Sequence, residues 1–240
     1  MRRFTTHFAA IGIVAYAWLV SAAPAESPPA EAGKSVRLFS QKGAPEDWVV
    51  RAWNDVSKPA QAEAAWVVNE QGVLTSIGGR GTWLMSKKEY GDFELQLDFK
   101  ITSQGNSGVA LRAPLAGDPA YGGMELQIVD PRYYQGHGEP EQLCGAIYRG
   151  VAPTKDMLKP EEWNTYKITC RGPSVKVILN GELIQDVNLD EQTKPLHQDT
   201  PEKVTKPLKD RPRKGHIGFQ DLGKDGRTQI RNVSLREIPG

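Results

Sequence analysis

A carboxylate, an amide and a guanidinium lie close together in this sequence, on two segments that alternate apolar with polar residues. Arg112 ends the first segment, and Glu125 and Gln127 belong to the second. Because successive side chains of a strand point to opposite sides of a sheet, these three residues should share the face opposite an apolar stripe. A carboxylate can transfer a proton, a guanidinium can stabilise a developing negative charge, and an amide can hold a hydroxyl group. The apolar stripe would consist of Val109, Leu111, Met124, Leu126 and Ile128.

The residues between these polar groups are small. Gly108 and Ala110 precede Arg112 on the same predicted face, and Asn106 begins the segment. Small residues around fixed polar groups indicate space for a ligand. The alternative is a plain solvent-exposed face, in which Arg112 pairs with Glu125 to brace the sheet and Asn106 belongs to a turn.

The loop after the second segment, Pro131 to Gly145, contains further groups that could do chemistry. They are Tyr133, Tyr134, His137 and Glu139, followed by Tyr148. A loop that hangs from a rigid sheet at the edge of a cleft is a common place for binding residues, although it could equally be a polar surface excursion. Asp130 precedes Pro131, so it either contributes to the site or only starts a turn.

Short strand-like runs separated by turn signals predict an all-β chain. Asn180-Gly181 indicates a tight hairpin, since both turn positions favour positive φ, and only residues 60–65 could form a short helix. Many such runs favour an antiparallel β-sandwich or jelly roll. The expected strands cover residues 66–68, 73–76, 82–85, 93–101, 109–112, 124–129, 166–170, 175–179, 183–187, 216–219 and 229–235.

The N-terminus predicts export. Residues 1–23 combine a basic start, an apolar run and small residues at a cleavage position, which is typical of a secretory signal peptide; a single-span anchor is the alternative. Residues 24–35 would form a flexible tether and residues 36–240 a single domain. We therefore expect a periplasmic or secreted protein that has no membrane span in its mature form.

The charge balance gives no reason to expect nucleic acid as a partner. Without residues 1–23, 28 basic residues face 29 acidic ones. Cys144 and Cys170 could form a disulfide or remain buried thiols. Residues 190–214 are rich in proline and lysine, and their basic side chains favour a solvated insertion.

Several motifs occur in an order that resembles a known family. They are GVLTSIGGRGTWLMSKKEYGDFELQLDFKI, GNSGVALR, GMELQIVD, GAIYRGVAP, EEWNTYKITCRGPSVKVILNG and GHIGFQDLG. Together they resemble the bacterial domain of unknown function 1080, also called the 3-keto-disaccharide hydrolase domain, from about Val36 to Ile238. The resemblance implies a concanavalin-like β-sandwich, an exported location and a role in carbohydrate breakdown.

The implied substrate changes the chemistry that the site needs. Ordinary glycoside hydrolysis uses two carboxyl groups, here Glu125 with Asp130 or Glu139. In a 3-keto sugar the ketone acidifies the C2 proton, so that one base can start elimination of the glycoside, and water can then add back. Glu125 or His137 could be that base.

Other residues would assist this reaction. Arg112 could stabilise the enolate, and His137 or Tyr148 could protonate the departing oxygen. Sugar contacts would come from Asn106, Gln127, Asp130, Tyr148 and Tyr121. No cofactor is required, although a divalent metal held by Glu125, Asp130 and His137 could replace the arginine.

The competing hypothesis is a non-catalytic, lectin-like carbohydrate-binding module. Enzymes and lectins share the sandwich fold, so fold does not discriminate between them. A binding module would display aromatic platforms, here Trp83, Tyr121, Tyr133 and Tyr134. A structural sandwich within a larger surface assembly is a third hypothesis.

Overall fold

The computed structural model describes residues 33–78, 81–197, 204–222 and 228–239. The predicted signal peptide and nearly all of the predicted tether lie outside this range. The strands are β1 (Val36–Arg37), β2 (Trp48–Ala52), β3 (Asp55–Pro59), β4 (Ala65–Val68), β5 (Leu74–Ile77), β6 (Thr82–Tyr90), β7 (Phe93–Lys100), β8 (Asn106–Ala113), β9 (Met124–Val129), β10 (Asn164–Arg171), β11 (Ser174–Leu179), β12 (Glu182–Asn188), β13 (Leu196–His197), β14 (Val204–Thr205), β15 (Gly215–Asp221) and β16 (Gln229–Glu237). Within these ranges, helical structure is limited to α1 (Pro119–Gly122) and four 3-10 turns, η1 (Pro131–Tyr134), η2 (Pro140–Gln142), η3 (Leu189–Glu191) and η4 (Leu208–Asp210).

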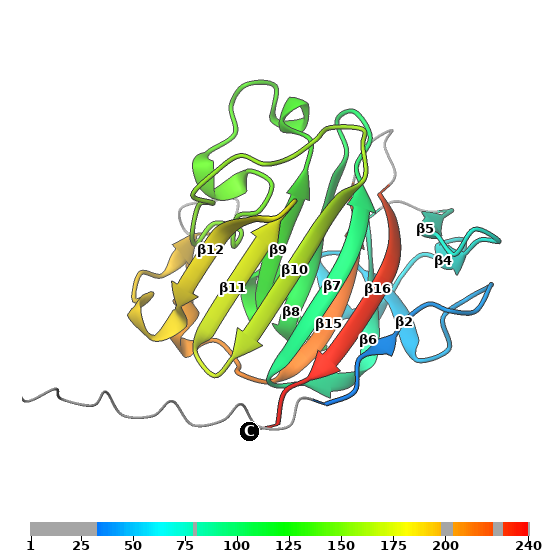
Figure 1. Cartoon of the computed structure of the whole chain (residues 1–240), viewed down its shortest axis with the longest axis horizontal. Coiled ribbons are helices and arrows are strands. Elements are labelled where there is room, and N and C mark those ends of the chain that lie inside the picture. The colour runs from blue at the N-terminus through cyan, green and yellow to red at the C-terminus, as the bar shows by residue number, and fades with distance from the viewer. Residues whose placement is uncertain (1–32, 79–80, 198–203, 223–227, 240) are drawn as a thin grey trace, which may run out of the picture.

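Two antiparallel sheets face each other and form a sandwich (Figure 1). One sheet has the strand order β12-β11-β10-β7-β16-β5-β4, with β1 paired to β16, and the other has the order β3-β2-β6-β15-β8-β9. Most neighbours in these sheets are distant in sequence, as in β15 between β6 and β8. The predicted concanavalin-like jelly-roll fold is thereby confirmed.

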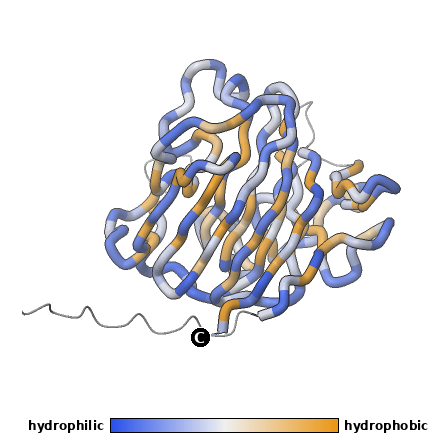
Figure 2. Tube along the Cα trace, in the orientation of Figure 1, coloured by the Kyte–Doolittle hydropathy of each residue, from blue (hydrophilic) through white to orange (hydrophobic). Residues whose placement is uncertain are grey.

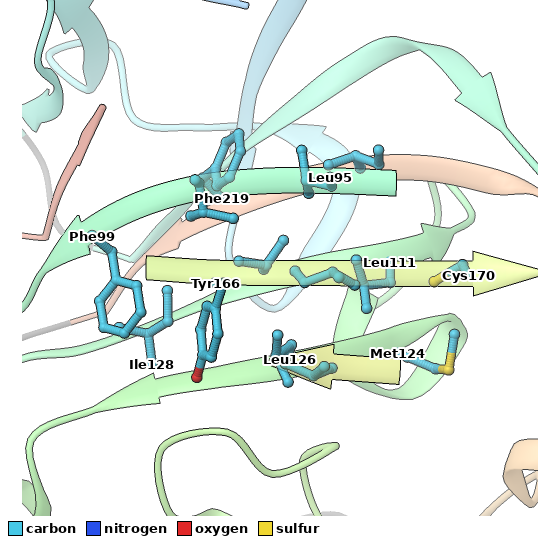
Figure 3. Packing of buried hydrophobic residues seen from close by; sticks show 14 of the residues in the cluster. Leu95, Phe99, Leu111, Met124, Leu126, Ile128, Tyr166, Cys170 and Phe219 are labelled. Atoms are coloured by element: carbon cyan, nitrogen blue, oxygen red, sulfur yellow. The ribbon is translucent and has the colours of Figure 1, made fainter. Parts of the chain in front are cut away.

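The alternation of the strands decides which side chains form the core. Strand β7 reads FELQLDFK, and every apolar residue in it is buried, whereas its polar residues are at least partly exposed. Figure 2 shows the same alternation of hydropathy along the strands, and Figure 3 shows apolar side chains of facing strands meeting between the sheets. The predicted core is confirmed, with no member more than 1% exposed: Phe93, Leu95, Leu97, Phe99, Val109, Leu111, Met124, Leu126 and Ile128.

Truncation of this core should be costly. Leu97 is fully buried, so Leu97→Ala should lower the free energy of unfolding by about 2–5 kcal/mol through lost burial and an unfilled cavity. Leu183, at 47% exposure, provides the matched control, and Leu183→Ala should change the stability by less than about 0.5 kcal/mol. Denaturant unfolding of both variants measures the difference; equal stabilities would contradict the core assignment.

Of two predictions of local structure, the hairpin at Asn180-Gly181 is confirmed and the short helix at residues 60–65 is not. Asn180 and Gly181 adopt φ values of 52° and 90°, and Leu179 pairs with Glu182 across the turn, which confirms the hairpin. The predicted helical piece at residues 60–65 is wrong: these residues form a turn that leads into β4. Six residues are too few to close more than one helical turn, and the adjacent strand pairing dominates.

The insertion at residues 190–214 is anchored rather than fully solvated. Arg211 is only 4% exposed, and its guanidinium donates to the carbonyl oxygen of Gly123 at 3.0 Å and of Lys206 at 2.9 Å. Burial lowers the pKa of Arg211 to about 10. Arg211 therefore fastens the insertion to the end of α1, because Gly123 is the residue that caps that helix.

Both cysteines are buried free thiols, so the disulfide alternative is not realised. The thiol of Cys144 lies 3.3 Å from the hydroxyl of Tyr166, which donates to the carbonyl oxygen of Gln127. Burial raises the pKa of Cys144 to about 11 and that of Cys170 to about 12. Neither thiol is therefore ionised at neutral pH.

Within the described ranges, no helix has both the length and the apolar character needed to cross a membrane.

Candidate functional site

The outer face of the six-stranded sheet carries small residues at its centre. Ala110 pairs with Gly218 on one side and with Glu125 on the other, and Gly108 pairs with Gln127. A Cβ atom at Gly108 would overlap the carboxyl group of Glu125. The absence of a side chain at Gly108 therefore allows the Glu125 side chain to lie across β8.

A cleft of about 340 Å³ opens above this part of the sheet. Its floor is formed by β8, β9 and β15, and its walls by α1, η1, the segment that leads to Arg149 and the turn between β2 and β3. Of the residues predicted from sequence, the cleft gathers Asn106, Tyr121, Glu125, Gln127 and Tyr148.

Glu125 is the buried carboxyl group of the cleft. Its side chain is 4% exposed. Burial raises the pKa of Glu125 well above its ordinary value of 4.5, and the nearby carboxylate of Asp118 raises it further. A carboxyl group with a raised pKa is a stronger base once ionised and titrates closer to neutral pH, which is the property that a proton-transfer residue needs.

One wall of the cleft is tied to the strand that carries Glu125. The backbone N–H of Tyr148 donates to the carbonyl oxygen of Glu125 at 2.9 Å, and that of Gln127 donates to Ala146 at 2.9 Å. The ring of Tyr148 packs edge-on against Tyr121 at 6.3 Å, and the guanidinium of Arg149 lies 5.7 Å from the centre of the same ring. This wall therefore brings a phenol and a cation to the edge of the site, and burial raises the pKa of the Tyr148 phenol.

Asp130 holds the opposite loop in place. Its carboxylate caps η1 by accepting from the backbone N–H of Arg132 at 2.9 Å and also binds the Arg132 guanidinium, which lowers the pKa of Asp130. Asp130 does not line the cleft. Of the two roles that the sequence allowed, a site residue or the start of a turn, the structure shows the turn. The loop that it anchors presents Tyr134, whose hydroxyl accepts from the side-chain amide of Gln127 at 3.1 Å.

Trp53 forms an exposed aromatic rim. It lies in the turn between β2 and β3, 37% of it is accessible, and it lines the cleft. An exposed indole beside a polar cleft is suited to stacking on the apolar face of a sugar ring. The predicted platform Trp83 is fully buried, and its indole N–H donates to Trp53 O at 3.0 Å, whereas Tyr121, Tyr133 and Tyr134 do line the cleft.

The prediction that Arg112 shares the face of Glu125 is wrong. The pairing of β8 with β15 shifts between His216 and Gly218, so β8 contains an extra residue, and Arg112 adopts a φ of 52°. A β-bulge of this kind interrupts the alternation of side chains. The fully buried guanidinium instead binds two turns: it donates to Gly91 O at 2.8 Å and Asp92 Oδ1 at 3.0 Å between β6 and β7, and to Gly172 O at 2.7 Å between β10 and β11.

His137 is also absent from the cleft. It is exposed in the loop after η1, and its backbone N–H donates to Tyr134 O at 3.0 Å. The predicted metal ligands Glu125, Asp130 and His137 therefore do not come together. Among the residues that the structure describes, no group of three His, Cys, Asp or Glu side chains could hold a metal ion.

The sequence did not indicate several groups that line the cleft. Besides Trp53, they include Asp118, Arg149 and Gln220. Asp118 caps α1 by accepting from Ala120 N at 3.0 Å, and a D-P pair before a short apolar run was the available signal for it. A second hollow, of about 390 Å³, lies on the outer face of the other sheet among side chains such as Lys167, Lys176 and Arg236. Among the described residues, no aromatic residue or buried carboxyl group lines it, so the first cleft is the candidate functional site.

Comparison with known proteins assigns the family. The family described as the 3-keto-alpha-glucoside-1,2-lyase-like domain matches residues 35–236. Comparison with curated proteins finds no match. Among solved structures, a protein from Parabacteroides distasonis described as "Putative glycosyl hydrolase" is 30% identical, with a TM-score of 0.69, covering 85% of this chain and 100% of that one.

A second protein of the same description from that organism is 22% identical, with a TM-score of 0.63, and covers 86% of this chain and 94% of its own. It supports the fold alone. The family match spans most of the 240 residues and includes β1 through most of β16. This chain thus belongs to the 3-keto-alpha-glucoside-1,2-lyase-like family of carbohydrate-active proteins.

Proposed function

We propose that this protein is an exported enzyme that cleaves 3-keto-glycosides, including 3-keto-disaccharides, by base-initiated elimination followed by hydration. The observation that carries the proposal is the buried Glu125 carboxyl group, held flat over Gly108 in a cleft with tyrosines and an arginine at its wall. A site for binding alone has no need of a buried carboxyl group whose pKa is raised well above its ordinary value.

The reaction assigns one proton transfer to Glu125. The ionised carboxylate removes the C2 proton, and the electron pair of the C–H bond moves toward the C3 ketone to form an enolate. Collapse of the enolate forms a double bond between C1 and C2 and breaks the bond from C1 to the glycosidic oxygen. Addition of water then places a hydroxyl group on C1 and a proton on C2, so that the net change is hydrolysis.

Two further roles, protonation of the departing oxygen and stabilisation of the enolate, belong to residues of the cleft wall beside Glu125. The backbone N–H of Tyr148 is hydrogen-bonded to the carbonyl oxygen of Glu125, and the Tyr148 side chain carries a hydroxyl group that can protonate the departing oxygen. Arg149 is the cationic side chain among the described residues around the cleft, and it takes over the enolate stabilisation that the sequence had suggested for Arg112. Because a guanidinium has five N–H donors, it can keep a protein partner and still bind an oxyanion.

Turnover of oxidised sugars tests the proposal. Purified protein should convert at least one of 3-keto-trehalose, 3-keto-sucrose and 3-keto-lactose, and should leave the unoxidised disaccharides intact because their C2 proton is not acidic. The assay is run with and without a chelator, which reports any metal requirement. Cleavage of the unoxidised sugars at equal rates would contradict the elimination mechanism.

A carbohydrate-binding module remains the alternative function, favoured by the exposed Trp53 and by the tyrosines of the cleft. The same experiment separates the two: binding of the sugars by calorimetry without conversion of any 3-keto sugar would identify a binding module. Export would be shown by recovery of the mature protein without residues 1–23 from outside the cytoplasm.

A further inference from the structure

Three buried amide groups on the floor of the cleft each have an oxygen atom without a hydrogen-bond partner in the described structure. They are Asn106 Oδ1, Gln127 Oε1 and Gln220 Oε1, on side chains that are 6%, 1% and 4% exposed. All three residues line the same cleft. A buried acceptor without a partner costs free energy, and native proteins seldom retain one without a reason.

The two other buried glutamines among the described residues make side-chain hydrogen bonds within the protein, and their oxygen atoms are not left without a partner. The amide of Gln185 donates to Gly145 O at 2.9 Å and to Val151 O at 3.2 Å. The side-chain oxygen of Gln142 accepts from Glu139 N at 3.0 Å. Among the buried side-chain amides of the described residues, those whose oxygen has no partner all line the cleft.

Strand register places the three amides around one point of the floor. Gln127 pairs with Gly108 from β9, and Phe219 pairs with Val109 from β15, so that Gln220 lies on the other side of Gly108 when the register continues. It does continue, because Leu222 N donates to Asn106 O at 3.0 Å. With neighbouring strands about 4.8 Å apart and a rise of about 3.3 Å per residue, the three backbone positions span roughly 10 Å by 7 Å.

We infer that Asn106, Gln127 and Gln220 bind hydroxyl groups of a single sugar ring on the floor of the cleft, and that Gln220 is a specificity-determining residue. A hydroxyl group suits these positions because it can donate to the amide oxygen. A carboxylate or phosphate at the same position of the ring has no proton to donate and would face the lone pairs of the amide. The site therefore selects rings whose hydroxyl groups are free on this face and rejects acidic sugars there.

This inference rests on the proposed function only in that a sugar occupies the cleft; it does not require catalysis. The test uses binding of unoxidised methyl pyranosides, which are not consumed: the α- and β-anomers of glucose, galactose, mannose and xylose. Isothermal titration identifies the tightest of these, and its monodeoxy derivatives are then titrated against the natural protein and against Gln220→Met, which keeps the side-chain length and removes the amide.

The expected result is a pairing between one residue and one hydroxyl group. Gln220→Met should weaken binding of the parent glycoside by roughly 2- to 12-fold, the value of one hydrogen bond. One monodeoxy derivative should bind the natural protein more weakly by a similar factor and should bind Gln220→Met as tightly as the parent does. Unchanged affinity in Gln220→Met, equal losses for every derivative, or no binding of any glycoside would overturn the inference.

Thermal unfolding without ligand provides a second readout. Removing an unpartnered acceptor should leave the midpoint of Gln220→Met unchanged or raise it, whereas the matched variant Gln185→Met, which loses two hydrogen bonds, should unfold at a lower temperature. If the unfolding midpoint of Gln220→Met fell as much as that of Gln185→Met, Gln220 would have a structural role, and the inference would be overturned. Failure of the proposed function is separate: the paired affinities would persist while 3-keto sugars remained unconverted.

Discussion

Glu125→Gln should reduce turnover of a 3-keto-disaccharide by orders of magnitude while much of the binding persists. Glutamine keeps the shape of the side chain over Gly108, but its amide cannot accept the C2 proton. Steady-state kinetics should therefore show the loss in kcat, and calorimetry should show retained affinity. Glu70→Gln is the matched control, because Glu70 is an exposed partner of Lys42 outside the cleft and should retain activity.

The same substitution should change how stability depends on pH. The folded protein holds the Glu125 proton above the ordinary pKa of 4.5, so this residue's contribution to the free energy of unfolding is complete below that value and is lost as pH rises through the folded pKa. Glutamine does not titrate. Glu125→Gln should therefore become progressively more stable than the natural protein as pH rises from about 4.5, as urea unfolding at several pH values would reveal.

Two outcomes would contradict the role of Glu125. Near-natural turnover in Glu125→Gln would exclude Glu125 as the base. A stability difference that does not change with pH would show that the Glu125 carboxyl group is not held in its neutral form by burial.

Arg112→Ala should destabilise the protein by about 3–5 kcal/mol rather than act on the chemical step. The side chain is fully buried, and its loss removes three hydrogen bonds to the β6–β7 and β10–β11 turns and leaves two carbonyl oxygens and Asp92 without this partner. Arg236→Ala is the matched control, since Arg236 pairs with Glu94 at the surface, and its loss should cost at most about 1 kcal/mol. Chemical denaturation measures both variants.

Kinetics separates the two interpretations of Arg112. At a temperature where Arg112→Ala remains folded, its kcat should stay close to that of the natural protein, because the guanidinium lies outside the cleft. A large fall in kcat with unchanged stability would restore the catalytic role that sequence alternation first indicated.

Sequence by itself determined the features that depend on local periodicity. Alternation within residues 93–101 and 124–129 fixed the buried face of each strand and, with it, the outward direction of Glu125 and Gln127. The Asn180-Gly181 turn was likewise local, because its two residues tolerate positive φ without tertiary support. Fold class and family followed from many such segments in a fixed order.

Only the tertiary structure decided which strands distant in sequence pair with one another, and in which register. The bulge that turns Arg112 inward exists because the register shifts where β8 pairs with β15, which lies about a hundred residues later in the sequence. Trp53 and Gln220 enter the cleft from the β2–β3 turn and from β15, far in sequence from the strand of Glu125. Alternation specifies a face but not which strands become neighbours, and in a sandwich those neighbours are set by long-range pairing and by burial of the shared core.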